Sequence, residues 1–155
     1  LAEVRRDVPT ARLIAGGDGP LVGRFLDEAR ALGVSDAVDY RGYVIDVEPL
    51  FAVATVTVLV SRYEGFPNVL IESLSRGIPV AAFDCPTGPS EIIASGVNGA
   101  IAPLGDVAAL ARGVVELIQD PPAPRALLNS IARYDRESIV RAYESVLDEC
   151  VEALK

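Results

Sequence analysis

Short apolar runs rich in Val, Ile, Leu and Ala alternate along the chain with longer segments of helical periodicity. The apolar runs are nearly continuous, a pattern typical of parallel strands that helices cover on both faces. One of them begins at Pro79, a tolerated position because the first residue of a strand need not donate to the ladder. The predicted strands are residues 12–16, 38–43, 55–60, 79–83 and 99–102.

Helical segments fill the intervals between these strands. Pro20 and Gly33 frame the first of them, which fits the preference for proline inside the start of a helix and glycine just past its end. Another has apolar residues at positions 107, 110, 114, 117 and 118, which form one face of a helix. The predicted helices are residues 20–32, 68–76, 89–94, 107–118, 125–132 and 136–154.

The alternation of strands and helices predicts an α/β fold with a Rossmann-like, doubly wound parallel sheet. Residues 1–155 are expected to form a single domain, with tail helices at about 125–154 after a proline-rich break. The longest apolar run, residues 50–60, has 11 residues and is predicted to be a buried element, since a membrane-spanning helix needs about 20.

Composition and charge narrow the possible functions. The net charge is −8, from 22 acidic and 14 basic residues, and no cluster of Lys and Arg stands out, so no nucleic-acid partner is expected. Histidine is absent, which excludes His-based triads, His–metal sites and a His general base. Cys85 and Cys150 are too few for a disulfide framework or an all-cysteine zinc site, and Cys85 is expected to be a small buried residue.

A glycine-rich turn, Gly16-Gly17-Asp18-Gly19, follows the first predicted strand. Glycines at such a turn let the backbone approach a ligand closely, so Gly17 is a candidate ligand-binding residue. The dinucleotide fingerprint is not satisfied, because Val22 occupies the place of its third glycine and no phosphate-binding lysine follows. A tight turn between strand and helix, without any ligand, explains these residues equally well.

The most informative segment is residues 61–72, SRYEGFPNVLIE. It follows a predicted strand at the edge where open parallel sheets bind ligands, with Glu64 on the loop and Glu72 one turn into the next helix. A charge on that apolar helix either reaches solvent or accepts hydrogen bonds from ligand hydroxyls. Backbone amides at residues 68–70 face the same crevice and suit a pyrophosphate.

Glu64 and Glu72, with seven residues between them in the context EGFPNVLIESLSRGIPV, resemble the E-x7-E signature of GT-B glycosyltransferases, in particular the retaining family GT4. Four further segments are similar to that family in the same order: LIAGGDGP, VDYRGYVIDVEPLFAVATVTVLVS, PVAAFDCPTGPSEII and GVNGAIAPLGDVAALARGVVELI. The resemblance covers about residues 8–120. It implies the C-terminal, donor-binding domain of a longer two-domain protein.

The resemblance also implies roles for individual residues. Glu64 would contact hydroxyls of the donor sugar, Glu72 the ribose diol, and backbone groups at Tyr43 and Val44 the base. The sugar and diphosphate would contact the backbone at Gly65, Phe66, Asn68, Val69 and Leu70. The alternatives are that Glu64 is a solvated loop acid, that Glu72 is a surface residue of an amphipathic helix, and that Phe66 belongs to the core.

A second loop, CPTGPSE at residues 85–91, leads into the next predicted helix. Ser90 and Glu91 either cap that helix or line the acceptor side of the crevice.

The function implied is that of a hexosyltransferase donor domain, which binds a nucleotide diphosphate sugar, with UDP expected, for transfer with retention. Neither metal nor cofactor is expected. The acceptor (a glycan, a lipid-linked sugar or a small molecule) is unknown. The family's phosphate-neutralising Arg and Lys and its N-terminal domain would precede Leu1, so no general base is assigned and the chain alone is expected to be inactive. The expected setting is cell-envelope polysaccharide biosynthesis in the cytoplasm, with peripheral attachment to the inner face of the membrane as a further option.

Two alternatives stay open. Nucleotide-sugar 2-epimerases share the architecture, although they do not usually show the context EGFPNVLIE. A non-catalytic binding module related to the transferases is the other. A phosphoacceptor receiver domain is not favoured, because it needs an acidic cluster on its first strand and a lysine near its fifth, and the sequence has neither.

Overall fold

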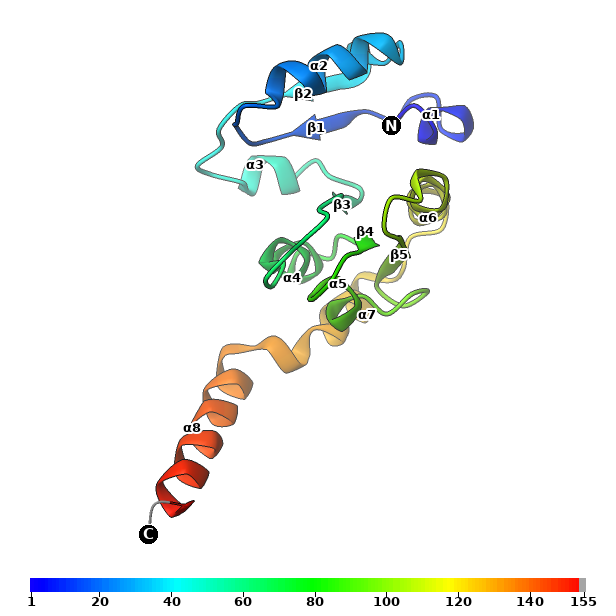
Figure 1. Cartoon of the computed structure of the whole chain (residues 1–155). Helices are drawn as coiled ribbons and strands as arrows, with labels where there is room; N and C mark the ends of the chain where they lie inside the picture. Colours follow the sequence, from blue (N-terminus) through cyan, green and yellow to red (C-terminus); the bar gives the residue numbers. More distant parts are fainter. Residues whose placement is uncertain (154–155) are drawn as a thin grey trace.

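The structure is a computed structural model that describes residues 1–153, and Figure 1 shows the course of the chain. Strands and helices alternate as the sequence predicts. The strands are β1 (Leu13–Ala15), β2 (Val38–Tyr40), β3 (Thr57–Leu59), β4 (Val80–Asp84) and β5 (Gly99–Pro103). The α-helices are α1 (Val4–Asp7), α2 (Val22–Ala31), α3 (Glu48–Phe51), α4 (Asn68–Ser75), α5 (Pro89–Ile92), α6 (Val107–Gln119), α7 (Pro124–Ser130) and α8 (Arg136–Ala153), and the 3-10 turns are η1 (Ser35–Ala37) and η2 (Ala132–Tyr134).

Every predicted strand and helix overlaps an observed one, and α1, η1 and α3 are additional short elements. The first three strands are shorter than predicted, and α2 begins at Val22, two residues after the expected Pro20. The segment predicted at 125–132 divides into α7 and η2. The last residue of the predicted helix 136–154 lies outside the described residues.

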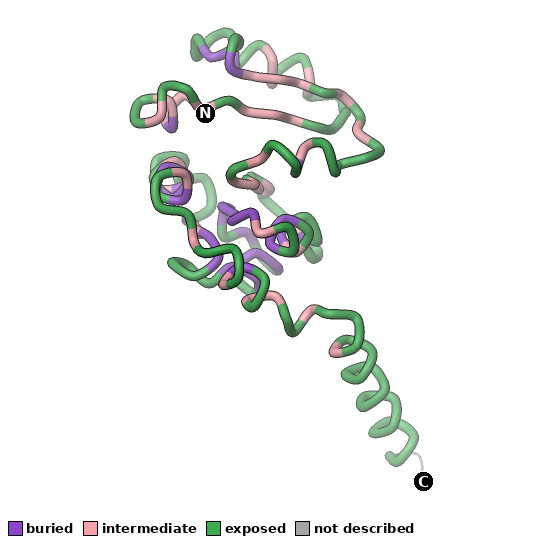
Figure 2. The backbone as a smooth tube through the Cα atoms, turned by 180° about the vertical axis from the view of Figure 1, so that it is seen from behind, coloured by how far each residue is buried: buried purple, intermediate pink, exposed green. Residues whose placement is uncertain are grey.

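All strands pair in parallel, which confirms the α/β class, but hydrogen bonds divide them into two sheets. β1 pairs with β2, with Leu13 opposite Val38, and the other sheet has the order β3-β4-β5. Within residues 1–153 no ladder joins β1 to β3, and Figures 1 and 2 show the two sheets apart. The expected single sheet is therefore interrupted beside β3.

The interruption explains why the prediction of one buried element at residues 50–60 is wrong. Phe51, at the end of α3, is buried, but Val53, Val58 and Val60 are 67%, 38% and 61% exposed. Because β3 is the edge of its sheet, no neighbouring strand lies beside it on one side to extend the apolar layers over these residues.

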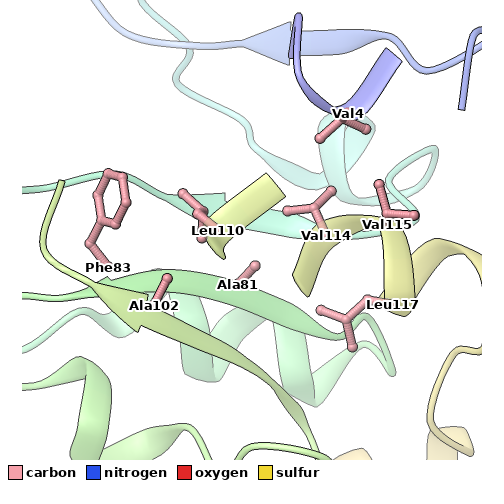
Figure 3. Close-up of a cluster of buried hydrophobic side chains, with 8 residues drawn as sticks. All are labelled: Val4, Ala81, Phe83, Ala102, Leu110, Val114, Val115 and Leu117. Carbon is pink, nitrogen blue, oxygen red and sulfur yellow. The ribbon is translucent and has the colours of Figure 1, made fainter. Parts of the chain in front are cut away.

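β4 is the central strand of the larger sheet and is buried on both faces. Ala81 and Phe83 face one apolar cluster, in which α6 supplies most partners (Figure 3): Val4, Ala81, Phe83, Ala102, Leu110, Val114, Val115 and Leu117. Val80 and Ala82 face the other cluster, in which α4, α5 and α7 supply the partners: Leu70, Leu74, Val80, Ala82, Ile92, Ile93 and Leu127. Helices thus cover this sheet on both sides, as predicted for a doubly wound fold.

Helix α6 packs unusually close to β5. Its cap is Asp106, whose carboxylate accepts a hydrogen bond from the amide of Ala109 at 2.9 Å. One turn of the helix approaches the strand at Gly113, where a Cβ atom would lie 2.6 Å from the Cβ of Ala100. The glycine, which is unfavourable inside a helix, is required here by the packing.

Helix α8 extends away from the rest of the molecule (Figures 1 and 2), and none of its residues is buried. Its exposed apolar residues recur at the spacing of one helix face. This α8 stripe consists of Ile139, Val140, Tyr143, Val146, Leu147 and Val151. In the described part of the chain, no helix combines the length and the apolar character needed to cross a bilayer. Cys85 is buried, as predicted, and Cys150 is exposed.

We predict that Gly113→Ala destabilises the protein by about 1–3 kcal/mol, because the new methyl group collides with Ala100 and forces α6 away from β5. Gly23→Ala is the matched control. Gly23 is also helical, but a Cβ atom there meets no atom within 4 Å, so that alanine is expected to stabilise the protein by about 0.4–1 kcal/mol. Urea unfolding followed by circular dichroism measures both. Equal effects of the two substitutions would contradict the packing argument.

Candidate functional site

The two glutamates of the motif lie beyond the carboxyl end of β3, on the segment that leads into and through α4. Glu64 is half-buried and Glu72 is exposed. The hydrogen bonds that the two residues accept within residues 1–153 go to their backbone carbonyls and not to their carboxylates. The charge of Glu72 thus reaches solvent, one of the two outcomes expected for it, and both carboxylates are available to a ligand.

The first turn of α4 supplies backbone donors between these glutamates. The amide of Asn68 donates to the carbonyl of Phe66 at 3.0 Å, and that of Leu70 donates within the same turn, also at 3.0 Å. The amides of Gly65, Phe66 and Val69 have no acceptor within residues 1–153. Unpaired amides at a helix start form a favourable site for an anion. Three of the five predicted backbone contacts are therefore free to donate.

The loop that follows β4 holds the Glu64 loop in place. Thr87 has left-handed backbone geometry, with φ of 63°, and its hydroxyl donates to the carbonyl oxygen of Glu64, with the carbonyl of Pro86 as a second acceptor at 2.7 Å. A Cβ atom at Gly88 would lie 2.3 Å from the Cδ of Pro67. The two loops therefore touch at a point where only glycine fits, and the φ of Gly88, 99°, favours glycine as well.

The side chain of Glu91, on α5, holds the loop that follows β4 through a hydrogen bond. The Oε1 of Glu91 accepts a hydrogen bond from the amide of Gly88 at 3.1 Å, which confirms the capping interpretation for Glu91. Ser90 is exposed, and its hydroxyl makes no hydrogen bond within residues 1–153.

Phe66 lies on the surface side of the site. Its side chain is 42% exposed, and its ring packs against Tyr134 of η2 with 5.7 Å between the ring centroids. The alternative that Phe66 belongs to the core therefore does not hold. The Tyr134 hydroxyl donates to the carbonyl of Glu91 at 3.0 Å, so η2 holds the two loops together from outside.

The glycine turn and the predicted base-binding segment form a separate unit. Both backbone groups of Gly17 are engaged, since its amide donates to the facing loop at 2.6 Å and its carbonyl accepts from the Tyr40 hydroxyl at 2.7 Å. A Cβ atom at Gly16 would lie 3.0 Å from the Cγ2 of Val44, so Val44 packs on the turn. Tyr43 is 76% exposed. Gly17 thus holds the turn together, and Tyr43 presents a free ring.

Two interactions that organise the site were missed by reasoning from the sequence. Thr87 reaches Glu64 across 23 positions, and an ion pair joins Arg76 of α4 to Glu48 of α3 across 28. Local patterns do not reveal contacts at such separations. The available signal was the position of Arg76 one turn after Glu72, at the spacing where helical side chains are neighbours.

A hollow of about 580 Å³ between β5 and α6, and a smaller one beside α2, contain none of the predicted site residues. In residues 1–153 no three side chains of the His, Cys, Asp and Glu type lie close enough together to hold a metal ion.

Comparison with known proteins places the chain in a family. A family model described as glycosyl transferases group 1 matches residues 1–120. An exopolysaccharide phosphotransferase of Streptomyces coelicolor is 35% identical over 97% of this chain, which spans 16% of that protein. The LpsE glycosyltransferase of lipopolysaccharide core biosynthesis from Rhizobium meliloti is 30% identical over 95% of this chain, which spans 44% of that protein.

Solved structures share the fold. The apo form of WaaB, a lipopolysaccharide outer core galactosyltransferase, has a TM-score of 0.84 at 22% identity, over 95% of this chain and 44% of WaaB. HepE from Anabaena in complex with UDP has a TM-score of 0.81 at 23% identity, over the same two shares. These likenesses confirm the predicted fold class. Because the family model matches most of the chain, the resemblance indicated by the motif is confirmed: the chain belongs to the glycosyl transferases group 1, of the GT4 type with the GT-B architecture.

Proposed function

We propose that this chain is the donor-binding domain of a retaining hexosyltransferase and that it binds a nucleotide diphosphate sugar, UDP-linked, between Glu64 and Glu72. The observation that carries the proposal is a pair of carboxylates that accept no hydrogen bond within residues 1–153, with three amides between them that donate none there. Family membership supports it. So do the names of two structures with the same fold, since HepE and the pneumococcal O-GlcNAc transferase GtfA were each solved in complex with UDP.

In this proposal the diphosphate lies at the start of α4. The amides of Gly65, Phe66 and Val69 point to an anion without the entropy cost of ordering a side chain, and the helix dipole adds to their effect. Asn68 and Leu70 contribute the shape of the turn, because their amides are already bonded. The three free amides are well suited to stabilise the negative charge that develops on the leaving diphosphate.

The carboxylates recognise hydroxyl groups. A ribose diol offers two donors to the exposed carboxylate of Glu72, and the half-buried Glu64 reaches the sugar from a backbone position that Thr87 fixes. The base lies toward Tyr43 and Val44, on the segment supported by the turn at Gly17. No metal or cofactor enters the proposal, and the general base is not assigned.

The activity of the whole protein is part of the proposal, because this chain spans less than half the length of LpsE and of WaaB. We infer that a second, acceptor-binding domain faces the donor site, and the uncovered α8 stripe supports a contact with it. The acceptor is a glycan, a lipid-linked sugar or a small molecule. The relatives' names support a role in cell-envelope polysaccharide biosynthesis. We further propose that the protein acts in the cytoplasm or at the inner face of the membrane.

A non-catalytic binding module is the second candidate, and one observation favours it. The S. coelicolor relative is named a phosphotransferase, and this chain matches only 16% of it, so the name describes a protein of which this domain is a small part. Turnover by the full-length protein decides between the two candidates. The nucleotide-sugar 2-epimerase alternative gains no support from the relatives' names.

We predict that Glu72→Gln weakens UDP binding by roughly 10- to 150-fold, which corresponds to losing about 1.5–3 kcal/mol of charge-assisted hydrogen bonding. An amide accepts through one oxygen only, and its NH2 group would face a hydroxyl that donates. Glu72→Asp keeps the charge and is expected to lose less. Titration calorimetry with UDP and with UDP-glucose measures each variant.

Glu64→Gln is the matched control for this experiment, because its proposed partner is the sugar and not the nucleotide. It should leave UDP binding unchanged and weaken binding of a UDP-sugar that the wild-type protein accepts. If Glu64→Gln weakens UDP binding as much as Glu72→Gln does, the assignment of the two glutamates is wrong. Absence of UDP binding by the wild-type chain would refute the proposed function itself.

Gly88→Ala is expected to displace the Glu64 loop, because the new Cβ atom would lie only 2.3 Å from the Cδ of Pro67. We predict that the free energy of unfolding falls by about 1–3 kcal/mol. Relative to wild type, the affinity for the UDP-sugar should fall more than the affinity for UDP. Gly105→Ala is the control, since Gly105 also has a positive φ, 82°, but its Cβ atom meets nothing within 4 Å. A Gly88→Ala protein no less stable than Gly105→Ala would show that the contact with Pro67 is not a constraint.

The chain alone is predicted to show no donor-dependent glycosyl transfer. Holding both reactants in place contributes roughly 7–11 kcal/mol to catalysis, and the proposed acceptor wall is not part of this chain. The measurement is transfer from a radiolabelled UDP-sugar to lipid-linked or soluble saccharide acceptors, with the full-length protein as the positive control. Transfer by the purified chain would contradict the prediction.

A further inference from the structure

Arg76 directly follows α4, and its planar guanidinium group makes four interactions. Its Nε donates to the Oε2 of Glu48 at 3.1 Å, and its Nη2 donates to the Oε1 of the same carboxylate. Its Nη1 donates to the carbonyl of Glu72 at 2.6 Å. The guanidinium also stacks over the ring of Phe51, 4.6 Å from its centroid. The bidentate pairing, the carbonyl and the ring together determine both the position and the plane of the group.

The ion pair between Arg76 and Glu48 contributes little to folding stability, but it has a specific geometry. The hydrogen bond from Arg76 lowers the pKa of the Glu48 carboxyl and raises the pKa of the guanidinium, so both stay charged at neutral pH. Both groups are solvated, and pairs of this kind contribute little to folding stability. What the pair does instead is join two segments that are otherwise held separately.

Those segments are the two parts of the proposed nucleotide site. Glu48 begins α3 directly after the loop that carries Tyr43 and Val44, and its amide donates to the carboxylate of Asp46 at 3.0 Å. That loop packs on the glycine turn of the β1–β2 sheet. Glu72 belongs to α4, which packs on the other sheet. The ion pair therefore crosses the interruption between the two sheets, where no backbone ladder connects them.

We propose that Arg76 is a positioning residue of the nucleotide site, which, with Glu48, sets the distance between the base-binding loop at Tyr43 and Val44 and the ribose-binding carboxylate of Glu72. The inference rests on the function proposed above. In a nucleotide the separation between the base and the ribose hydroxyls is set by its covalent structure. The loop and Glu72 must therefore lie at a matching distance for both contacts to form. Because the Nε, Nη1 and Nη2 of Arg76 already bind other groups, we do not assign it a direct contact with phosphate.

The test compares Arg76→Gln, Glu48→Gln and the double variant by titration calorimetry with UDP. Each single change should weaken UDP binding roughly fivefold, as follows if the fraction of chains with a correctly placed loop falls to about one fifth. The double variant should bind no more weakly than either single variant, because the two side chains act as one unit. Arg30→Gln is the matched control: Arg30 forms an exposed helical ion pair with Asp27 on α2, and its loss should leave UDP binding unchanged.

Inorganic pyrophosphate is the second probe, and it separates positioning from a structural defect. Pyrophosphate is expected to bind the amides at the start of α4 and does not need the base-binding loop. Both single variants leave α4 and these amides intact. The affinity for pyrophosphate should therefore stay within about twofold of wild type in both, while the affinity for UDP falls. Equal losses for UDP and pyrophosphate, or a loss in Arg76→Gln that Glu48→Gln does not reproduce, would overturn the inference. If Arg76→Gln does not fold, Glu48→Gln decides alone with the same two probes.

The outcome also separates this inference from the proposed function. A wild-type chain that does not bind UDP refutes the proposed function. A wild-type chain that binds UDP, with unchanged affinity in both single variants, refutes the positioning role of Arg76 and leaves the proposed function standing.

Discussion

The packing of β4 between two apolar clusters is the constraint on which the rest of the structure depends. Its side chains alternate between the α6 side and the α4 side, so every residue from Val80 to Phe83 is removed from water. In a parallel sheet, the helices that connect neighbouring strands are what cover a strand on both faces. Because β3 and β4 are parallel, the loops that follow them leave the sheet at the same end, the carboxyl ends of the strands. The Glu64 loop therefore lies against Thr87 and Gly88.

At that edge, backbone contacts determine where the functional groups lie. The contact between Gly88 and Pro67 leaves no room for a side chain, and the Thr87 hydroxyl binds the carbonyl of Glu64 and leaves its carboxylate free. The loop is thus held through its main chain, while within residues 1–153 the Glu64 carboxylate accepts no hydrogen bond and the amides of Gly65 and Phe66 donate none. A site arranged in this way has polar groups that are already in place before a ligand arrives, which reduces the reorganisation that binding requires.

The sequence predicted the approximate strand and helix positions, the end of α2 before Gly33 and the burial of Cys85, because each depends on a local pattern. The two glutamates were found by their spacing, and among residues 1–153 no group donates a hydrogen bond to their carboxylates. The break between the sheets was not predictable in this way. Val58 and Val60 look like core residues in the sequence, and their exposure depends on a missing partner strand. The Arg76–Glu48 pair depends equally on which segments the fold brings together.

The exposure of Glu72 resolves an apparent conflict between the acidity of the chain and the proposed binding of an anion. Two unit charges 4 Å apart interact by about 1 kcal/mol in water but by about 4 kcal/mol at the lower effective dielectric of a protein surface region. A buried Glu72 would therefore repel a diphosphate strongly and would lose its own hydration. In its exposed position the carboxylate is screened, yet it can still accept hydrogen bonds from hydroxyls over short distances. The amides of Gly65, Phe66 and Val69 donate no hydrogen bond within residues 1–153, so in the proposed site they are free to attract the diphosphate directionally, whereas the repulsion from Glu72 is screened.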